Sequence, residues 1–177
     1  LSNHPHMSAQ KLARHIVNRA HLNDTFAAQD DISCSVIYFR KPRNLLVCSG
    51  PPYKKEKDAS MAQTIKTFKG TKIICGGTTA QIISRELGCE IDADLTSNDL
   101  ELPPLSYMEG VDLVSEGILT IGKVSDWLES RDPGEIDTNN AAGQIIHQLL
   151  AHDKITFLVG TRINEAHQDP SLPVELE

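Results

Sequence analysis

The strongest constraint on the fold is a regular exchange, from residue 44 onward, between short apolar runs and segments with a helical period. The apolar runs predict strands over residues 44–48, 71–75, 111–115 and 155–159. The periodic segments predict helices over residues 58–68, 78–87, 123–129 and 139–152. Strands that alternate with helices favour a mostly parallel open sheet. We therefore expect an α/β fold with helices on both faces of the sheet.

Local signals mark where these elements begin and end. Gly70 and Gly88 each follow a helical segment, where glycine commonly ends a helix. Thr78 stands three residues before Gln81, a spacing typical of a capping box at a helix start. The polar and then proline-rich residues 93–104 indicate a surface excursion.

A separate helix and strand precede this alternating region. Apolar residues at helical spacing predict a helix over residues 8–21 with Ser8 as its N-cap. The hydrophobic, β-branched residues 32–39 predict a strand. The polar, proline-containing segment Arg40–Asn44 follows, and there the pattern changes. We expect two domains, residues 1–41 and residues 42–177, the second of which is shortened at its C-terminus.

Composition limits the functional class. With 40% hydrophobic and 23% charged residues the chain is typical of a soluble globular protein. It begins at Leu1 and has no apolar run near the roughly 20 residues of a membrane helix. We expect a cytoplasmic fragment of a longer protein, with no membrane segment.

The charge is unevenly distributed. The net charge is −7, and residues 90–137 alone carry −11. This balance argues against nucleic-acid binding. The acidic stretch is either a cation site or, as such runs more often are, a solvated face. Lys54, Lys55 and Lys57 beside Tyr53 form either an anion patch or an ordinary exposed loop.

The four cysteines indicate no metal or disulfide framework. Cys34, Cys48, Cys75 and Cys89 lie far apart, and none belongs to a Cys-x-x-Cys motif. Three of them lie within or end apolar runs, so reduced and mostly buried thiols are the favoured interpretation.

Asp30 and Asp31 stand immediately before the expected strand 32–39. Carboxylates suit Mg²⁺ or Mn²⁺ because both cations prefer oxygen ligands, and a strand end holds a ligand rigidly. Two acidic residues before a strand are also common in a solvated turn. The spacing alone leaves both interpretations open.

The segments Leu12–Val17, Asn23-Asp24 and Ala28–Cys34 resemble the C-terminal end of bacterial metal-dependent serine/threonine protein phosphatases of the stage II sporulation protein E type. In that family the last helix of the catalytic domain leads into a strand headed by Asp-Asp or Asp-Asn, and the first Asp binds metal. The resemblance implies that Asp30 is a ligand for Mn²⁺ or Mg²⁺ and that Asp31 is its neighbour. It also implies a signalling enzyme whose substrate is a phosphoprotein.

The resemblance covers only residues 8 to 40. The family's other metal-binding aspartates, one of them in an Asp-Gly segment far upstream, have no counterpart in this sequence. The fragment by itself is therefore expected to be inactive.

Glycine, hydroxyl and charged residues follow each expected strand of the second domain. In an open parallel sheet, ligands bind beyond the carboxyl ends of the strands. An anionic small molecule would suit glycine-rich backbone, a helix N-terminus and an arginine. The candidate ligand-binding residues are Gly76, Gly77, Thr78, Thr79, Ser115, Glu116, Gly160, Thr161 and Arg162, with Gly50-Pro51-Pro52 forming a fourth loop. Ordinary turn chemistry explains the same glycines, since no dinucleotide or phosphate-loop fingerprint is present.

Residues 30–39, followed by residues 48–52 and 73–80, also resemble a C-terminal extension found in a bacterial subset of these phosphatases, which implies no established activity. The alternatives for the second domain are a regulatory module for an anionic metabolite or a protein partner, and an independent enzyme. The sequence offers no Ser-His-Asp or Cys-His spacing for the latter.

Overall fold

The computed structural model describes residues 8–25, 27, 30–93, 104–130 and 136–162. The chain divides into two units, Leu1–Lys41 and Pro42–Glu177. This division falls within the proline-containing segment that the sequence analysis chose as a boundary. That the first unit belongs to a phosphatase domain stays a prediction.

The first unit contains helix α1 (Ala9–Asn23), as the apolar spacing predicted. Ser8 is its N-cap, because the Ser8 Oγ accepts a hydrogen bond of 3.2 Å from the backbone N–H of Lys11. No residue of α1 is fully buried. The helix therefore has a polar start of the expected kind but little hydrophobic contact within its own unit.

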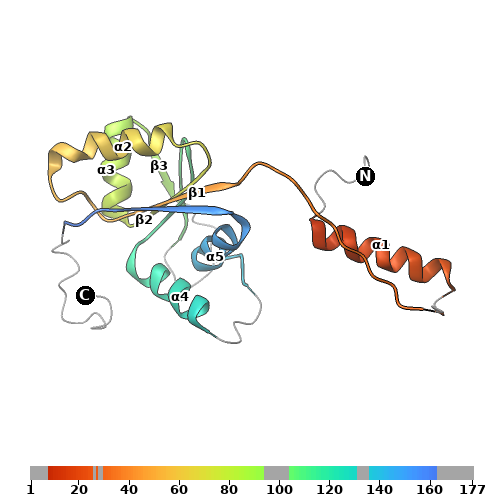
Figure 1. Ribbon diagram of the computed structural model, residues 1–177. Helices are drawn as coiled ribbons and strands as arrows, with labels where there is room; N and C mark the ends of the chain where they lie inside the picture. Colours follow the sequence, from red (N-terminus) through yellow and green to blue (C-terminus); the bar gives the residue numbers. More distant parts are fainter. Residues whose placement is uncertain (1–7, 26, 28–29, 94–103, 131–135, 163–177) are drawn as a thin grey trace. The chain divides into compact units, whose positions relative to one another are not determined.

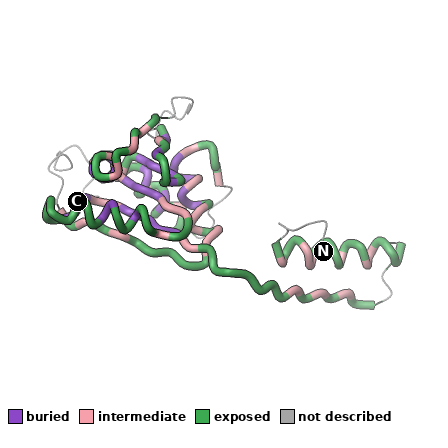
Figure 2. Tube along the Cα trace, turned by 90° about the horizontal axis from the view of Figure 1, so that it is seen from above, coloured by how far each residue is buried: buried purple, intermediate pink, exposed green. Residues whose placement is uncertain are grey.

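The prediction of a strand over residues 32–39 is wrong. Residues 31–43 have no regular secondary structure, although Ile32, Cys34 and Val36 are half-buried and the serines between them are exposed. Figure 2 shows this alternation along the extended segment beside α1. The side-chain period of a strand is present, but in the described residues no neighbouring strand supplies the hydrogen bonds that define one.

The second unit is built on a six-stranded sheet. Its strands are β1 (Asn44–Ser49), β2 (Thr71–Cys75), β3 (Ile91–Ala93), β4 (Ser106–Met108), β5 (Val111–Ser115) and β6 (Lys154–Val159). Their order is β3-β4-β5-β2-β1-β6. Strands β5, β2, β1 and β6 are parallel, whereas β3 and β4 pair antiparallel at one edge. The prediction of an α/β fold with a mostly parallel sheet is confirmed.

Helices cover both faces of the sheet, as predicted. Helices α2 (Asp58–Thr67) and α3 (Gly77–Leu87) lie on one face, and α4 (Ile118–Glu129) and α5 (Ala141–Ala151) lie on the other (Figure 1). A short 3-10 helix, Lys55–Lys57, leads into α2. The result is a three-layer arrangement whose central strands are shielded from water on both sides.

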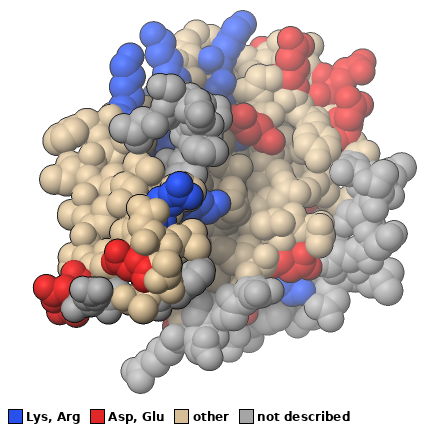
Figure 3. Space-filling model, turned by 90° about the vertical axis from the view of Figure 1, so that its right-hand side faces the viewer, with Lys and Arg blue, Asp and Glu red and all other residues tan. Residues whose placement is uncertain are grey.

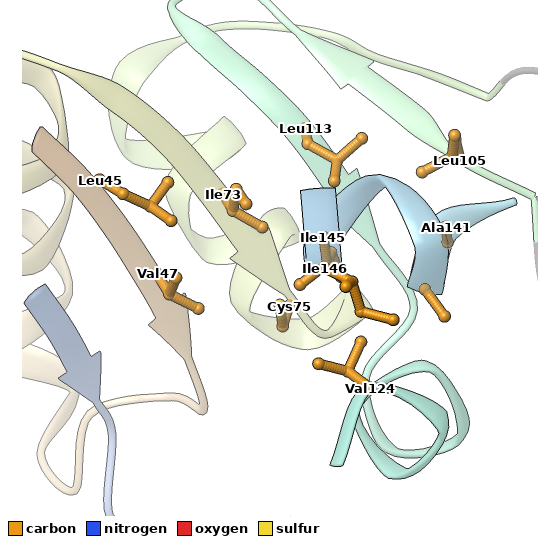
Figure 4. Packing of buried hydrophobic residues seen from close by; sticks show 11 residues of the cluster. Leu45, Val47, Ile73, Cys75, Leu105, Leu113, Val124, Ala141, Ile145 and Ile146 are labelled. Carbon is orange, nitrogen blue, oxygen red and sulfur yellow. The ribbon is translucent and has the colours of Figure 1, made fainter. Parts of the chain in front are cut away.

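Successive residues of the central strands alternate between two hydrophobic clusters. Leu45, Val47 and Ile73 face α4 and α5, where Ile145 and Ile146 point toward the sheet (Figure 4). Leu46 and Ile74 belong to the opposite cluster with α2 and α3. Strand runs that are continuously apolar are typical of parallel sheets buried on both faces.

Three details differ from the sequence predictions. Helix α3 begins at Gly77, and its N-cap is Gly76, whose φ of 116° is a conformation that residues with a side chain rarely adopt. Thr78 is therefore inside the helix rather than its cap, so the capping-box interpretation is wrong.

Helix α4 begins at Ile118, five residues before the expected start. Strands β3 and β4 were not predicted, because three residues are too few to show a period of two. The excursion predicted over residues 93–104 lies mostly outside the described residues.

We expect Ile74→Ala to lower the free energy of unfolding by about 2–5 kcal/mol, because Ile74 is fully buried and the substitution leaves a cavity. Denaturant unfolding followed by circular dichroism measures the change. Leu119→Ala, at an exposed position of α4, is the matched control and should change stability by less than about 1 kcal/mol. Equal losses in the two variants would contradict the assigned core.

Candidate functional site

Asp30 and Asp31 lie in the first unit, just before the extended segment. Both are exposed, and the backbone N–H of Asp31 donates a hydrogen bond of 2.8 Å to the Asp30 Oδ1. Asp30 offers carboxylate oxygen of the kind that Mg²⁺ and Mn²⁺ prefer. Across the described ranges, however, no three His, Cys, Asp or Glu side chains gather to hold a metal ion. Asp30 thus has the chemistry of one metal ligand, but Asp30 and Asp31 alone do not form a binuclear centre.

In the second unit, four loops follow the carboxyl ends of β1, β2, β5 and β6. Because these strands are parallel neighbours, their loops lie at the same end of the sheet. The Gly160 N–H donates to the Ser49 carbonyl at 2.8 Å, and the Arg162 N–H donates to the Pro51 carbonyl at 3.2 Å. The Gly76 N–H donates to the Ser115 carbonyl at 2.8 Å. The candidate residues thus form two hydrogen-bonded loop pairs, one after β1 and β6 and the other after β2 and β5.

Close packing explains two of the glycines. A Cβ atom on Gly50, whose φ is 78°, would lie 2.7 Å from the Gly160 carbonyl oxygen. A Cβ atom on Gly160 would collide with the backbone carbonyls of Gly50 and Pro51. The β1 and β6 loops approach each other so closely that only glycine fits. The alternative that these glycines serve an ordinary turn therefore accounts for Gly50 and Gly160 without a bound ligand.

Glu116 changes the electrostatics of the other loop pair. A Cβ atom on Gly77 would lie 3.0 Å from the Glu116 Oε1 and 3.2 Å from Oε2, so this carboxylate stands at the first turn of α3. A helix N-terminus carries partial positive charge and favours an anion. The protein's own carboxylate occupies that position. An external anion at Gly76, Gly77 and Thr78 would have to displace it, while Thr79 is buried in the same turn.

A groove of about 270 Å³ lies beside the β6 loop. Its lining includes Gly160 and Thr161 of the β6 loop, Tyr53 and Lys57, and residues of α2. Neither Gly76 nor Glu116 is part of its lining. Arg162 follows directly and is half-buried. Of the predicted ligand-binding residues, Gly160 and Thr161 therefore line a groove that also contains Lys57, and Arg162 is next to them in the chain.

A second hollow, which no sequence feature predicted, lies between α4 and α5. Its volume is about 440 Å³, and its lining includes Trp127, Asn140 and Ile146. The Trp127 indole N–H is buried and has no acceptor among the described residues. A lone tryptophan inside a helical segment carries no sequence signal for a hollow, because the facing helix comes later in the chain.

Burial controls the chemistry of the central thiols. Burial, followed by the nearby Cys75 thiol, raises the pKa of Cys48 to about 12. Burial also raises the pKa of Cys75. Ser115 is buried near Cys75, but within the described parts of the chain its Oγ has no hydrogen-bond partner of ordinary geometry. Neither thiol is activated as a nucleophile, since only the thiolate reacts.

Another buried polar group links two helices. Asp58 at the start of α2 is nearly inaccessible, and its Oδ2 lies 2.7 Å from the Arg85 Nη2 of α3. Glu86 also contacts this guanidinium at 2.8 Å. The ion pair is a structural connection between neighbouring helices rather than part of the strand-end loops.

Charged side chains of both signs lie on the face shown in Figure 3. No helix among the described residues is long and apolar enough to cross a membrane. Comparisons of the chain with protein families, with curated proteins and with solved structures found no match.

We expect a thiol reagent at neutral pH to modify Cys34 and Cys89, which are half-buried, while the folded chain protects Cys48 and Cys75. A rise of the Cys48 pKa from 9.0 to about 12 lowers its thiolate fraction by about 1,000-fold. Mass spectrometry of labelled peptides measures each site. Rapid labelling of Cys48 before unfolding would contradict this burial, and labelling in denaturant provides the control.

Proposed function

We propose that this chain is the C-terminal part of a bacterial metal-dependent serine/threonine protein phosphatase, with an appended α/β domain. Asp30 is one metal ligand and Asp31 its neighbour. In the complete enzyme, two bound Mn²⁺ or Mg²⁺ ions would supply the activation of water and the neutralisation of phosphoryl charge. The substrate class is phosphoserine or phosphothreonine in a protein.

The observation that carries this proposal is the surface of the first unit. Its extended segment has the alternation of a strand, yet Ile37, Tyr38 and Phe39 are exposed, Phe39 to 91%. Helix α1 likewise has Ile16 and Leu22 exposed. Exposed apolar side chains of this kind commonly mark a surface that packs against another part of a protein, and we infer that here it is the sheet of the complete domain. A helix, a turn with two carboxylates and a strand sequence without its sheet fit the end of a larger catalytic domain.

In a longer chain that carries this segment, we expect Asp30→Asn to lower Mn²⁺-dependent hydrolysis of a phosphoserine peptide by about 100-fold or more, because it removes a ligand charge at constant volume. Asp24→Asn, at the exposed end of α1, is the matched control and should retain activity. Full activity of Asp30→Asn would refute the ligand assignment. The 177-residue chain alone should show no turnover, and turnover that persists through further purification would refute the proposal.

A second candidate function is binding of an anionic small molecule by the α/β domain, as a regulator of the enzyme. The groove beside Gly160 supports it, because Lys57 lines the groove and Arg162 follows the same loop. A guanidinium and an ammonium group attract phosphate and carboxylate. The Gly76 loop supports it less, since Glu116 already stands at the α3 N-terminus. A protein partner is the alternative ligand class.

We expect a phosphate-bearing ligand to raise the melting temperature of the chain, since a ligand at about 100 times its Kd adds roughly 2.7 kcal/mol to stability. Arg162→Ala should abolish the shift. Lys66→Ala, in the last turn of α2 and outside the groove lining, should preserve it. Thermal shift across nucleotides and sugar phosphates provides the measurement. A shift that is equal in both variants would rule out this site.

A further inference from the structure

Strand β6 forms one edge of the sheet, and along the described chain only β1 pairs with it. Its sequence, Lys-Ile-Thr-Phe-Leu-Val, contains no proline, and its only charge is at its first residue. Phe157 is 64% exposed and Val159 is 63% exposed. Natural edge strands are usually protected by charge, proline or a bulge. This strand has none of these within its apolar run.

The hydrogen bonds to β1 show which backbone groups of β6 point outward. The N–H groups of Lys154 and Gly160 donate to carbonyls on the β1 side, those of Arg43 and Ser49. Backbone groups of alternate residues point to opposite edges of a strand. The N–H and C=O groups of Ile155, Phe157 and Val159 therefore point away from β1, toward the open edge.

The same three residues present their side chains on one face. In the register with β1, Ile155 is opposite Leu45 and Phe157 is opposite Val47, and both β1 residues face α4 and α5. Those helices cover Leu45 and Val47 but leave Ile155, Phe157 and Val159 exposed. An open edge and an apolar strip thus coincide on one strand.

We propose that β6 pairs antiparallel with β6 of a second copy of this chain, around a two-fold axis at Phe157. In this register Phe157 exchanges both backbone hydrogen bonds with the partner's Phe157. Ile155 does the same with the partner's Val159, and Val159 with the partner's Ile155. Every outward backbone group of the three residues is then satisfied, and the two sheets become one continuous sheet.

Side chains and charges fit the same register. The apolar strips become neighbours across the pair, with facing Cα atoms about 5.5 Å apart. Lys154 falls opposite Gly160, so the like charges of the two copies lie at opposite ends of the paired strands. A second copy is favoured over an unrelated extended peptide because it supplies an equally apolar strip and keeps the only charged residue of each strand, Lys154, away from its counterpart.

Sedimentation of the full chain over a range of concentrations tests this pairing. We expect a reversible dimer of twice the 19.5 kDa chain mass. Phe157→Lys and Phe157→Glu should each raise the dimer dissociation constant by about tenfold or more, because like charges then face each other at the axis. An equal mixture of the two variants should restore the dimer. Leu128→Lys, exposed on α4, should dimerise as the original chain does.

Several outcomes would overturn the proposal. A chain that stays monomeric at every concentration has no such interface, even if it binds an extended peptide. Dimers that survive Phe157→Lys but dissociate in Phe39→Lys use the first unit instead. Variants that are monomeric alone and in the mixture exclude the register at Phe157. Circular dichroism checks folding, and Val159→Lys, which should also weaken the dimer, replaces any Phe157 variant that unfolds.

Discussion

The second unit depends on the burial of β1 and β2 on both faces. Leu45, Leu46, Ile73 and Ile74 are at most 1% exposed, and adjacent residues of each strand belong to opposite clusters. Each such side chain contributes about 1.5–3 kcal/mol when it is removed from water. A strand of this kind is stable only between two helical layers. Parallel pairing of the central strands then brings all their following loops to one end of the sheet.

In contrast to the central strands, one edge of the sheet and the first unit expose large apolar side chains. Phe157 on β6 and Phe39 in the extended segment are both largely exposed, although each lies in a strand-like sequence. At the opposite edge, β3 has only three residues and carries the charged Asp92, which leaves little to pair. Exposed apolar side chains also lie on helices, such as Leu128 of α4 and Leu150 of α5, but β6 combines them with backbone groups that no described strand pairs.

The sequence predicted a helix or strand correctly where the residues of that element alone specify it. Ser8 caps α1, Gly88 ends α3 in the left-handed conformation, and the apolar run 71–75 is strand β2. Each depends on backbone preference or on burial of adjacent residues. The strand expected over residues 32–39 failed because a strand also needs a hydrogen-bonded neighbour. Strands β3 and β4 were missed because their pairing, rather than their composition, defines them.

For the candidate site, the sequence by itself determined which residues follow each strand and that parallel strands place them at one end. It could not determine how the loops meet. Only the tertiary structure placed the Glu116 carboxylate at the start of α3 and packed Gly50 against Gly160. These contacts join residues far apart in the chain, and their charge and spacing decide where an anion can bind. The sequence supplied the chemical groups, and folding decided which of them are neighbours, because electrostatic and steric contacts depend on distance in space.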